Sequence, residues 1–176
     1  RTLRHGLQPG GPAVYSQTPH SHRMSAMGKL SETLALAQER ARSLGLPYAG
    51  ALTPREAWDV LQLAPGSKLV DVRTRAEWDW VGRVPGAIEI EWMLYPGNEP
   101  NPHFLAHFKR QVDPEALVMF LCRSGARSNA AATLAAGSGF TNAYNILEGF
   151  EGDKDAGGHR NKVGGWRHAN LPWTQG

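Results

Sequence analysis

Short apolar runs recur along the chain and are separated by polar or glycine-containing segments. The clearest run, residues 116–121, is too apolar and too short for anything but a buried strand. Further strands are predicted at 68–72, 86–90 and 143–147. These four segments define the predicted sheet, and the chemistry is expected where the strands end.

Helical patterns alternate with these strands. Residues 53–56 read as a capping box with proline at the first helical position, which predicts a helix to Leu63. Its apolar face would contain Ala57, Val60, Leu61 and Leu63. Further helices are predicted near 75–80, 103–111 and 128–136. Alternating strands and helices predict an α/β fold, a parallel sheet with helices on both faces.

The first 45 residues have a different character. Residues 1–24 are rich in Gly, Pro, Ser, Gln and His and lack apolar periodicity, so we expect a disordered leader or tag. Residues 25–45 predict an amphipathic helix that ends at Gly45. We expect this helix to pack on its own domain rather than to pair two copies, leaving a monomer. Its apolar face would contain Leu30, Leu34, Ala37, Ala41 and Leu44.

Charge and composition narrow the possible partners. The acid-free segment 1–24 holds 3 of the 19 basic residues, so residues 25–176 carry 16 basic and 16 acidic residues. A balanced domain offers no basic stripe for nucleic acid. No segment approaches the roughly 20 apolar residues of a membrane helix. A single cysteine excludes an intramolecular disulfide and suits a reducing, cytoplasmic setting.

That cysteine, Cys122, stands where the buried strand 116–121 gives way to a turn and a helix. In an open parallel sheet, ligands bind beyond the carboxyl ends of the strands. Converging backbone N–H groups, a helix N-terminus and the charges of Arg123 and Arg127 would all favour the thiolate. A buried, inert cysteine is the alternative. Two arginines and two serines in a loop that core packing does not require favour the functional interpretation.

Several segments together resemble the rhodanese-like sulfurtransferases. The segment 122–128, CRSGARS, is similar to the active-site loop of that family. Residues 69–73 with Glu77, 82–87 and 144–149 resemble its other signatures, in the same order. The resemblance covers roughly 48–176. It implies a five-stranded parallel sheet whose first short strand lies near 48–51, and a rhodanese-like domain over 46–176.

The resemblance also implies a reaction. Cys122 would be the nucleophile that takes sulfane sulfur from thiosulfate or a similar donor and holds it as a persulfide. The persulfide would then pass to cyanide, a thiol or a protein acceptor, in two half-reactions with ping-pong kinetics. The N–H groups of the loop would hold the persulfide, and the side chains of Arg123 and Arg127 would attract the anionic donor. No cofactor or metal is implied. The loop comprises Cys122, Arg123, Ser124, Gly125, Ala126, Arg127 and Ser128.

A phosphatase and a sulfur carrier are the two alternative functions. Phosphatases of the same fold have a longer loop and a histidine before the cysteine, whereas this loop spans Cys122 to Arg127 and follows Leu121. A sulfur-carrier module is the remaining alternative, in which Cys122 holds persulfide for a protein partner with little free turnover. A large exposed apolar patch around the loop would favour the carrier.

Some positions depart from the family pattern or lie outside its motifs. Arg83 replaces the usual histidine, and we expect a surface pair with Glu77 or Asp79 rather than a wider positive field at the site. Asp71 and Arg73, at the end of a strand, are expected to form a buried ion pair that orients the loop. His103 and His107 have zinc-like spacing, but no third ligand is apparent, so we interpret 103–111 as a packing helix.

The glycine-rich stretch 149–176, with Trp166 and Trp173, resembles the tail of a bacterial single-domain rhodanese subgroup. It would leave the last strand beside the active loop. One interpretation is a tail that is simply packed by its two tryptophans. We favour the hypothesis that part of it forms a wall of the site and influences the choice of acceptor. On this hypothesis, deletion of 150–176 changes acceptor selectivity while the fold survives.

Overall fold

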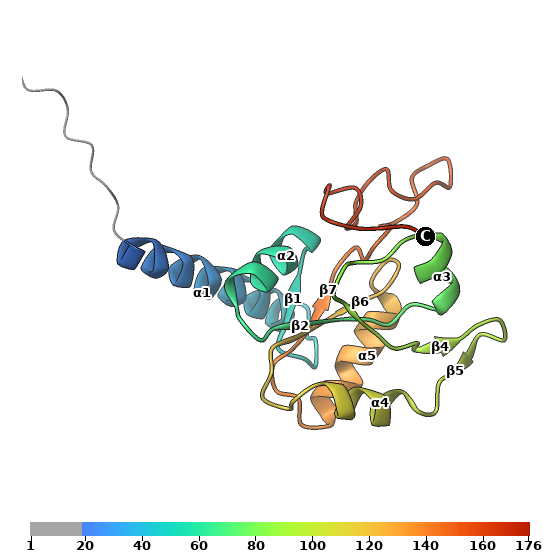
Figure 1. The fold of residues 1–176 in the computed structure, drawn as a ribbon, viewed down its shortest axis with the longest axis horizontal. Coiled ribbons are helices and arrows are strands. Elements are labelled where there is room, and N and C mark those ends of the chain that lie inside the picture. The colour runs from blue at the N-terminus through green and yellow to red at the C-terminus, as the bar shows by residue number, and fades with distance from the viewer. Residues whose placement is uncertain (1–18) are drawn as a thin grey trace, which may run out of the picture.

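A computed structural model describes residues 19–176 (Figure 1). Its main sheet has five parallel strands in the order β1-β7-β6-β2-β3, which confirms the expected fold class. The order places β6 and β7, which precede the cysteine loop and the tail, at the centre of the sheet beside β2. The strands are β1 (Gly50–Leu52), β2 (Lys68–Asp71), β3 (Ile88–Glu89), β6 (Val118–Leu121) and β7 (Ala143–Ile146).

Five helices accompany the sheet within residues 19–176. Both α2 and α3 begin at complete capping boxes, in which Thr53 with Glu56 and Thr74 with Glu77 bond reciprocally. The first box was predicted, whereas the second was not. The helices are α1 (Pro19–Ser43), α2 (Pro54–Leu63), α3 (Arg75–Trp80), α4 (Phe104–Gln111) and α5 (Ala126–Gly137).

Helix α1 is longer than the sequence pattern predicted. It begins at Pro19 and so includes residues 19–24, which were expected to belong to the leader; residues 1–18 lie outside the described residues. Extending a packed helix costs far less than nucleating one, since each added residue adds one hydrogen bond. Ala37 and Ala41 are buried on the domain as expected, but Leu44 is 62% exposed because it follows the last helical residue. The N-terminal part of α1 projects away from the sheet (Figure 1).

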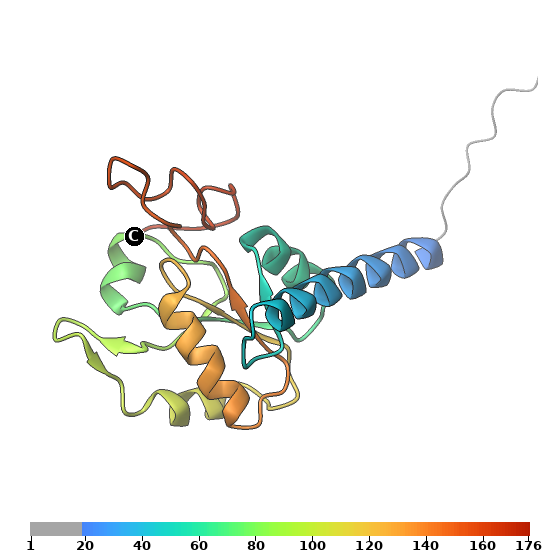
Figure 2. The ribbon, with the colours of Figure 1, turned by 180° about the vertical axis from the view of Figure 1, so that it is seen from behind.

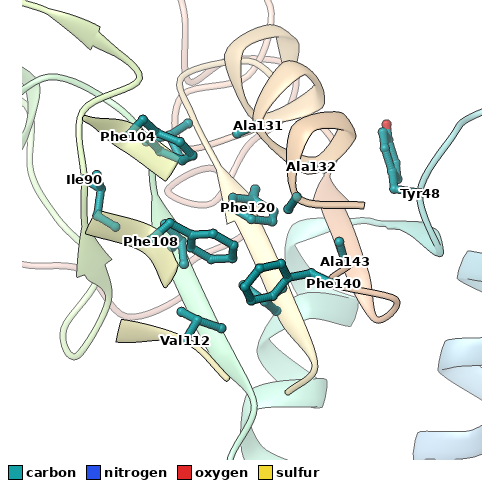
Figure 3. Close-up of a cluster of buried hydrophobic side chains, with 14 of the residues drawn as sticks. Tyr48, Ile90, Phe104, Phe108, Val112, Phe120, Ala131, Ala132, Phe140 and Ala143 are labelled. Atoms are coloured by element: carbon teal, nitrogen blue, oxygen red, sulfur yellow. The ribbon is translucent and has the colours of Figure 1, made fainter. Parts of the chain in front are cut away.

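The two faces of the sheet are covered by different elements. Along β6, Val118 and Phe120 join one buried cluster while Met119 and Leu121 join the other, as the two-residue period of a strand requires. Helices α4 and α5 cover the first face, where Phe108 packs 4.5 Å from Phe140, ring centre to ring centre (Figure 3). Helices α1 and α2 cover the second face. Helices on both faces were the expectation, and this packing confirms it.

The C-terminal tail completes the second face. Phe150 and Trp166 are fully buried there, and Trp166 packs edge-on against Trp58 of α2 at 6.1 Å. The end of the tail is tied back by two backbone hydrogen bonds between Arg83 and Thr174, of 2.8 and 2.9 Å. Removing residues 150–176 would strip large aromatic side chains from the core. We therefore expect this deletion to unfold the domain, contrary to the expectation of an intact fold.

A short antiparallel hairpin, β4 (Met93–Leu94) with β5 (Glu99–Pro100), was not predicted. Two-residue strands are too short to leave a periodic signal in the sequence. Seen from behind, the hairpin lies on the same side of the molecule as α3 and the tail (Figure 2). Within residues 19–176, no helix is long and apolar enough to cross a membrane.

Candidate active site

Three neighbouring parallel strands bring the predicted site residues to one edge of the sheet. Asp71 ends β2, Cys122 follows β6, and the tail leaves β7. Because β2, β6 and β7 are adjacent and parallel, their carboxyl ends meet at this edge. Hydrogen bonds join the segments there: Val72 N–H donates to Leu121 O at 2.8 Å, and Phe150 N–H donates to Cys122 O at 2.8 Å.

The cysteine sulfur lies inside the turn that the loop makes before α5. The Gly125 N–H donates to Cys122 Sγ at 3.1 Å, and Ser128 Oγ lies 3.2 Å from the same sulfur. Gly125 has a φ of 108°, a conformation that favours glycine. Cys122 is 1% exposed. The sulfur therefore faces hydrogen-bonding groups and the beginning of a helix, as expected from the sequence.

The tail braces the backbone of this loop from the other side. Besides the bond to Cys122 O, the Glu151 N–H donates to Arg123 O at 3.0 Å. Gly149 makes this approach possible, because a Cβ at that position would lie 2.5 Å from the Arg123 backbone. Its φ of 65° also favours glycine. The loop is thus held in place by residues 149–151, which follow the neighbouring strand β7.

Arg127 forms an ion pair with Glu77, which the sequence did not predict. Its two terminal nitrogens each donate to one oxygen of Glu77 at 2.8 Å. Burial raises the pKa of Glu77, but hydrogen bonds from Arg127 and Thr74, with the Arg127 charge, outweigh it and lower the pKa to about 2. The hydrogen bond from Arg127 to Glu77 correspondingly raises the pKa of Arg127. Much of the positive charge of Arg127 is therefore compensated by Glu77.

Arg123, by contrast, is exposed beside the cysteine and has no ion-pair partner within residues 19–176. Both arginines line the same cavity as Cys122. The uncompensated positive charge beside Cys122 therefore comes from Arg123 more than from Arg127. Ser124 and Ala126, the other loop residues, also line this cavity.

Asp71 and Arg73 form the buried ion pair that the sequence suggested. Both side chains are 0% exposed, and Arg73 Nη2 lies 2.7 Å from Asp71 Oδ2. The guanidinium also donates to Gly82 O at 2.8 Å and stacks over the Phe150 ring at 4.1 Å. Since the Phe150 N–H donates to Cys122 O, Phe150 connects the ion pair to the loop.

Arg83 forms an ion pair at the surface with Asp79, one of the two partners expected for it. Its Nη2 donates to Asp79 at 2.6 Å, and its Nε lies 3.5 Å from Glu89. These partners hold the Arg83 side chain, which does not line the cysteine cavity.

A cavity of about 960 Å³ opens over the cysteine. The sequence did not single out Trp80, Trp92, Met93 and Tyr95, which line it from α3 and the hairpin region. The only hint in the sequence was the clustering of large apolar residues before the Pro-Gly at 96–97. From the tail, Glu151 and Arg160 also line the cavity, in the place where a wall was expected.

His103 and His107 stack on each other at the start of α4, with ring centres 6.0 Å apart. Phe104 and Phe108 of the same helix are buried in the core. Within residues 19–176 there is no cluster of three or more metal-ligating side chains. The helix packs through its phenylalanines, as the spacing predicted.

Comparison with known proteins places this architecture in a family. Residues 53–156 match the rhodanese-like domain. A Rickettsia rickettsii protein of uncharacterised function is 39% identical over 120 residues, which cover 67% of this chain and 91% of the relative. The thiosulfate sulfurtransferase GlpE of Actinobacillus succinogenes is 29% identical over 69% of this chain and 86% of its own. The chain belongs to the rhodanese-like domain family.

Solved structures share this fold. The crystal structure of Rv0390 from M. tuberculosis has a TM-score of 0.68 and 44% identity, and the match covers 73% of this chain and 99% of that one. The polysulfide-sulfur transferase homodimer of Wolinella succinogenes shares the fold, with a TM-score of 0.51 at 19% identity over 92% of this chain and 95% of its own.

Proposed function

We propose that the protein is a sulfurtransferase that moves sulfane sulfur from thiosulfate, or a similar anionic donor, to a nucleophilic acceptor through a persulfide on Cys122. The observation that carries this proposal is the environment of Cys122 Sγ, with the Gly125 N–H at 3.1 Å and Ser128 Oγ at 3.2 Å. The family membership supports it, and so does the name of the related thiosulfate sulfurtransferase GlpE.

In the first half-reaction, the Cys122 thiolate attacks the outer sulfur of thiosulfate. A bond forms between Sγ and that sulfur, and the S–S bond of thiosulfate breaks with its electron pair leaving on sulfite. The new persulfide sulfur extends from Sγ into the cavity. The Gly125 N–H and the N-terminus of α5 offset its negative charge, and the exposed Arg123 attracts the dianionic donor.

In the second half-reaction, a nucleophile attacks the outer sulfur of the persulfide. The bond from Sγ to that sulfur breaks and its electron pair returns to Cys122, which regenerates the thiolate. The hydrogen bonds that held the original thiolate also stabilise this leaving group. Because the two substrates bind in turn to the same sulfur, ping-pong kinetics are expected.

One observation favours the second candidate function, a sulfur carrier for a protein partner. Large apolar side chains are exposed around the cavity, among them Trp80 at 79% and Tyr95 at 66%. Exposed apolar surface of this kind often marks a contact with another molecule. A carrier would load Cys122 as readily as an enzyme but would release its sulfur slowly to small acceptors.

Intact-mass spectrometry before and after thiosulfate, combined with a thiocyanate assay, tests the proposal. Wild type is expected to gain the mass of one sulfur atom and to lose it again on addition of cyanide. Cys122→Ser should gain no mass, and its turnover should fall by at least about a thousandfold because the nucleophile is absent. An unchanged unfolding curve for Cys122→Ser would assign the loss to chemistry.

Each outcome has a definite meaning. Mass gain with rapid thiocyanate formation supports the enzyme, and mass gain with negligible turnover supports the carrier. Sulfur that still loads on Cys122→Ser would refute the assignment of Cys122. No gain on wild type with either thiosulfate or polysulfide would refute the proposed function.

A further inference from the structure

The cavity over Cys122 is much larger than an inorganic sulfur donor needs. Thiosulfate has five heavy atoms and would occupy roughly the space of three or four water molecules at about 30 Å³ each. The cavity measures about 960 Å³. The cavity therefore has room for a larger molecule than the donor, and the acceptor is the second molecule that has to reach the same sulfur.

One part of the cavity wall is apolar and aromatic. Trp80 at the end of α3 is 79% exposed and Tyr95 is 66% exposed, while Trp92 and Met93 are half-buried beside them. Trp92 and Met93 also line a second cavity of about 220 Å³, whose other walls include Phe104. Apolar pockets with a few polar groups are typical of sites for organic ligands.

Another part of the wall carries charge. Apart from Cys122 itself, and with Arg127 compensated by Glu77, the ionic groups on the cavity are Arg123, Arg160 and Glu151, which together carry one net positive charge. Arg160 is held in place by its bond to Gly152 O at 2.7 Å. The hairpin and the tail lie on opposite sides of α3 in both ribbon views (Figures 1 and 2). The charged groups come from the Cys122 loop and the tail, and the aromatic groups from α3 and the hairpin region.

We propose that the acceptor is an organic thiol with an apolar body and an anionic group, and that Trp80 and Tyr95 determine this specificity. This inference rests on the proposed function. A small molecule fits better than a folded protein, because Cys122 is 1% exposed and lies within a cavity. The thiol would approach Cys122, the apolar body would lie on the aromatic wall, and the anionic group would face Arg123 or Arg160.

The transfer step needs no further reactant. The acceptor thiolate attacks the outer sulfur of the Cys122 persulfide and forms a new S–S bond. The bond between Sγ and that sulfur breaks, and its electron pair stays on Cys122. The products are an organic persulfide anion and the Cys122 thiolate, so that charge is conserved and no proton moves in this step. Sulfane sulfur changes carrier without an external oxidant or reductant.

A series of thiols that differ only in their apolar body tests the specificity. Mercaptopropionate, mercaptohexanoate and mercaptooctanoate each carry a thiol at one end and a carboxylate at the other. Cys122 persulfide is prepared first, and its decay is followed by intact mass in single turnovers. Burial of each methylene group is worth up to about fourfold in binding, so kcat/KM should rise at least about tenfold along the series.

Substitution of the aromatic wall should remove this dependence. In Trp80→Ala with Tyr95→Ala, the rise along the series should shrink to about twofold, because the longer chains have no surface to cover. Leu36→Ala is the matched control, since Leu36 is 54% exposed on α1 and does not line the cavity. That control should keep the full chain-length dependence.

The outcomes separate this inference from the function on which it rests. If no persulfide forms, the proposed function fails before any acceptor is added. If persulfide forms but all thiols react at equal rates, or the double variant keeps the wild-type dependence, the acceptor inference is overturned. Faster transfer to a small protein with a surface cysteine than to any of the three thiols would overturn it in favour of the carrier.

Discussion

Two arginine–carboxylate pairs lie near the Cys122 loop, and they differ in burial and in sequence separation. Asp71 and Arg73 are two residues apart and 0% exposed, whereas Glu77 and Arg127 are 50 residues apart with side chains 18% and 23% exposed. Both carboxylates receive two nitrogens of their arginine. The pair of Asp71 with Arg73 thus lies in the interior of the domain, whereas the pair of Glu77 with Arg127 lies in the cavity wall.

The difference shows what each pair can contribute. Two charges removed from water lose a large solvation energy, which their attraction recovers only when the remaining groups are also bonded. Arg73 gains Gly82 O and the Phe150 ring, but its Nη1 has no hydrogen-bond partner within residues 19–176. The buried pair should therefore respond strongly to loss of one member, and the cavity pair less so.

The largest effect is expected from Arg73→Met. This change leaves the Asp71 carboxylate buried without its counter-charge and should lower the free energy of unfolding by about 3–5 kcal/mol. Urea unfolding measures the change directly. Asp71→Asn combined with Arg73→Met removes both charges and should recover most of the loss. A single-variant loss below about 1 kcal/mol would remove the distinction between the two pairs.

Sequence separation explains which of these pairs could be predicted. Asp71 and Arg73 lie on one strand end, so their contact could be inferred from spacing alone. The pair of Glu77 with Arg127 depends on how α3 sits against α5, which no local pattern records. The cysteine loop was predictable because a strand, a turn and a helix follow one another in sequence. The aromatic wall was not, because it joins α3 to a hairpin whose strands have only two residues each.

The tail is a second region that local sequence patterns predict only in part. Its glycines and tryptophans indicated a loop beside the site, and Glu151 and Arg160 do line the cavity. Its tryptophans also indicated packing, but their partner could not be predicted, because Trp166 packs against Trp58, more than one hundred residues earlier. Local sequence patterns predict where the Cys122 loop lies. The residues that line the cavity around it depend on contacts between segments that are distant in sequence.

An intermediate effect is expected from Glu77→Gln, which removes the charge from the cavity pair. The loss at neutral pH should be about 2 kcal/mol, less than the lowered pKa alone would imply, because the pair is partly open to water. The carboxyl has a pKa of about 2 in the folded protein against an ordinary value of 4.5. Its stabilising effect is therefore complete above the ordinary value and is lost as the pH falls through the folded value.

Unfolding measured across this pH range sharpens the comparison. The difference in stability between wild type and Glu77→Gln should stay constant above about pH 5.5 and disappear near pH 2. A difference that persists at pH 2 would mean that Glu77 acts through its shape and neutral hydrogen bonds and not through its charge.

The smallest effect is expected at a third pair, which lies at the surface. Asp79 is 45% exposed and receives Arg83 Nη2 at 2.6 Å and Arg75 Nε at 3.6 Å. Asp79→Asn should change the free energy of unfolding by no more than about 0.5 kcal/mol, because water screens exposed ions. Arg83 also keeps Glu89 as a partner at 3.5 Å, which limits the cost further. Any loss should vanish at about 1 M salt, where screening is nearly complete. A loss above about 1 kcal/mol that persists at high salt would mean that this pair behaves like the buried pair. The contribution of the three pairs to stability would then not follow their exposure.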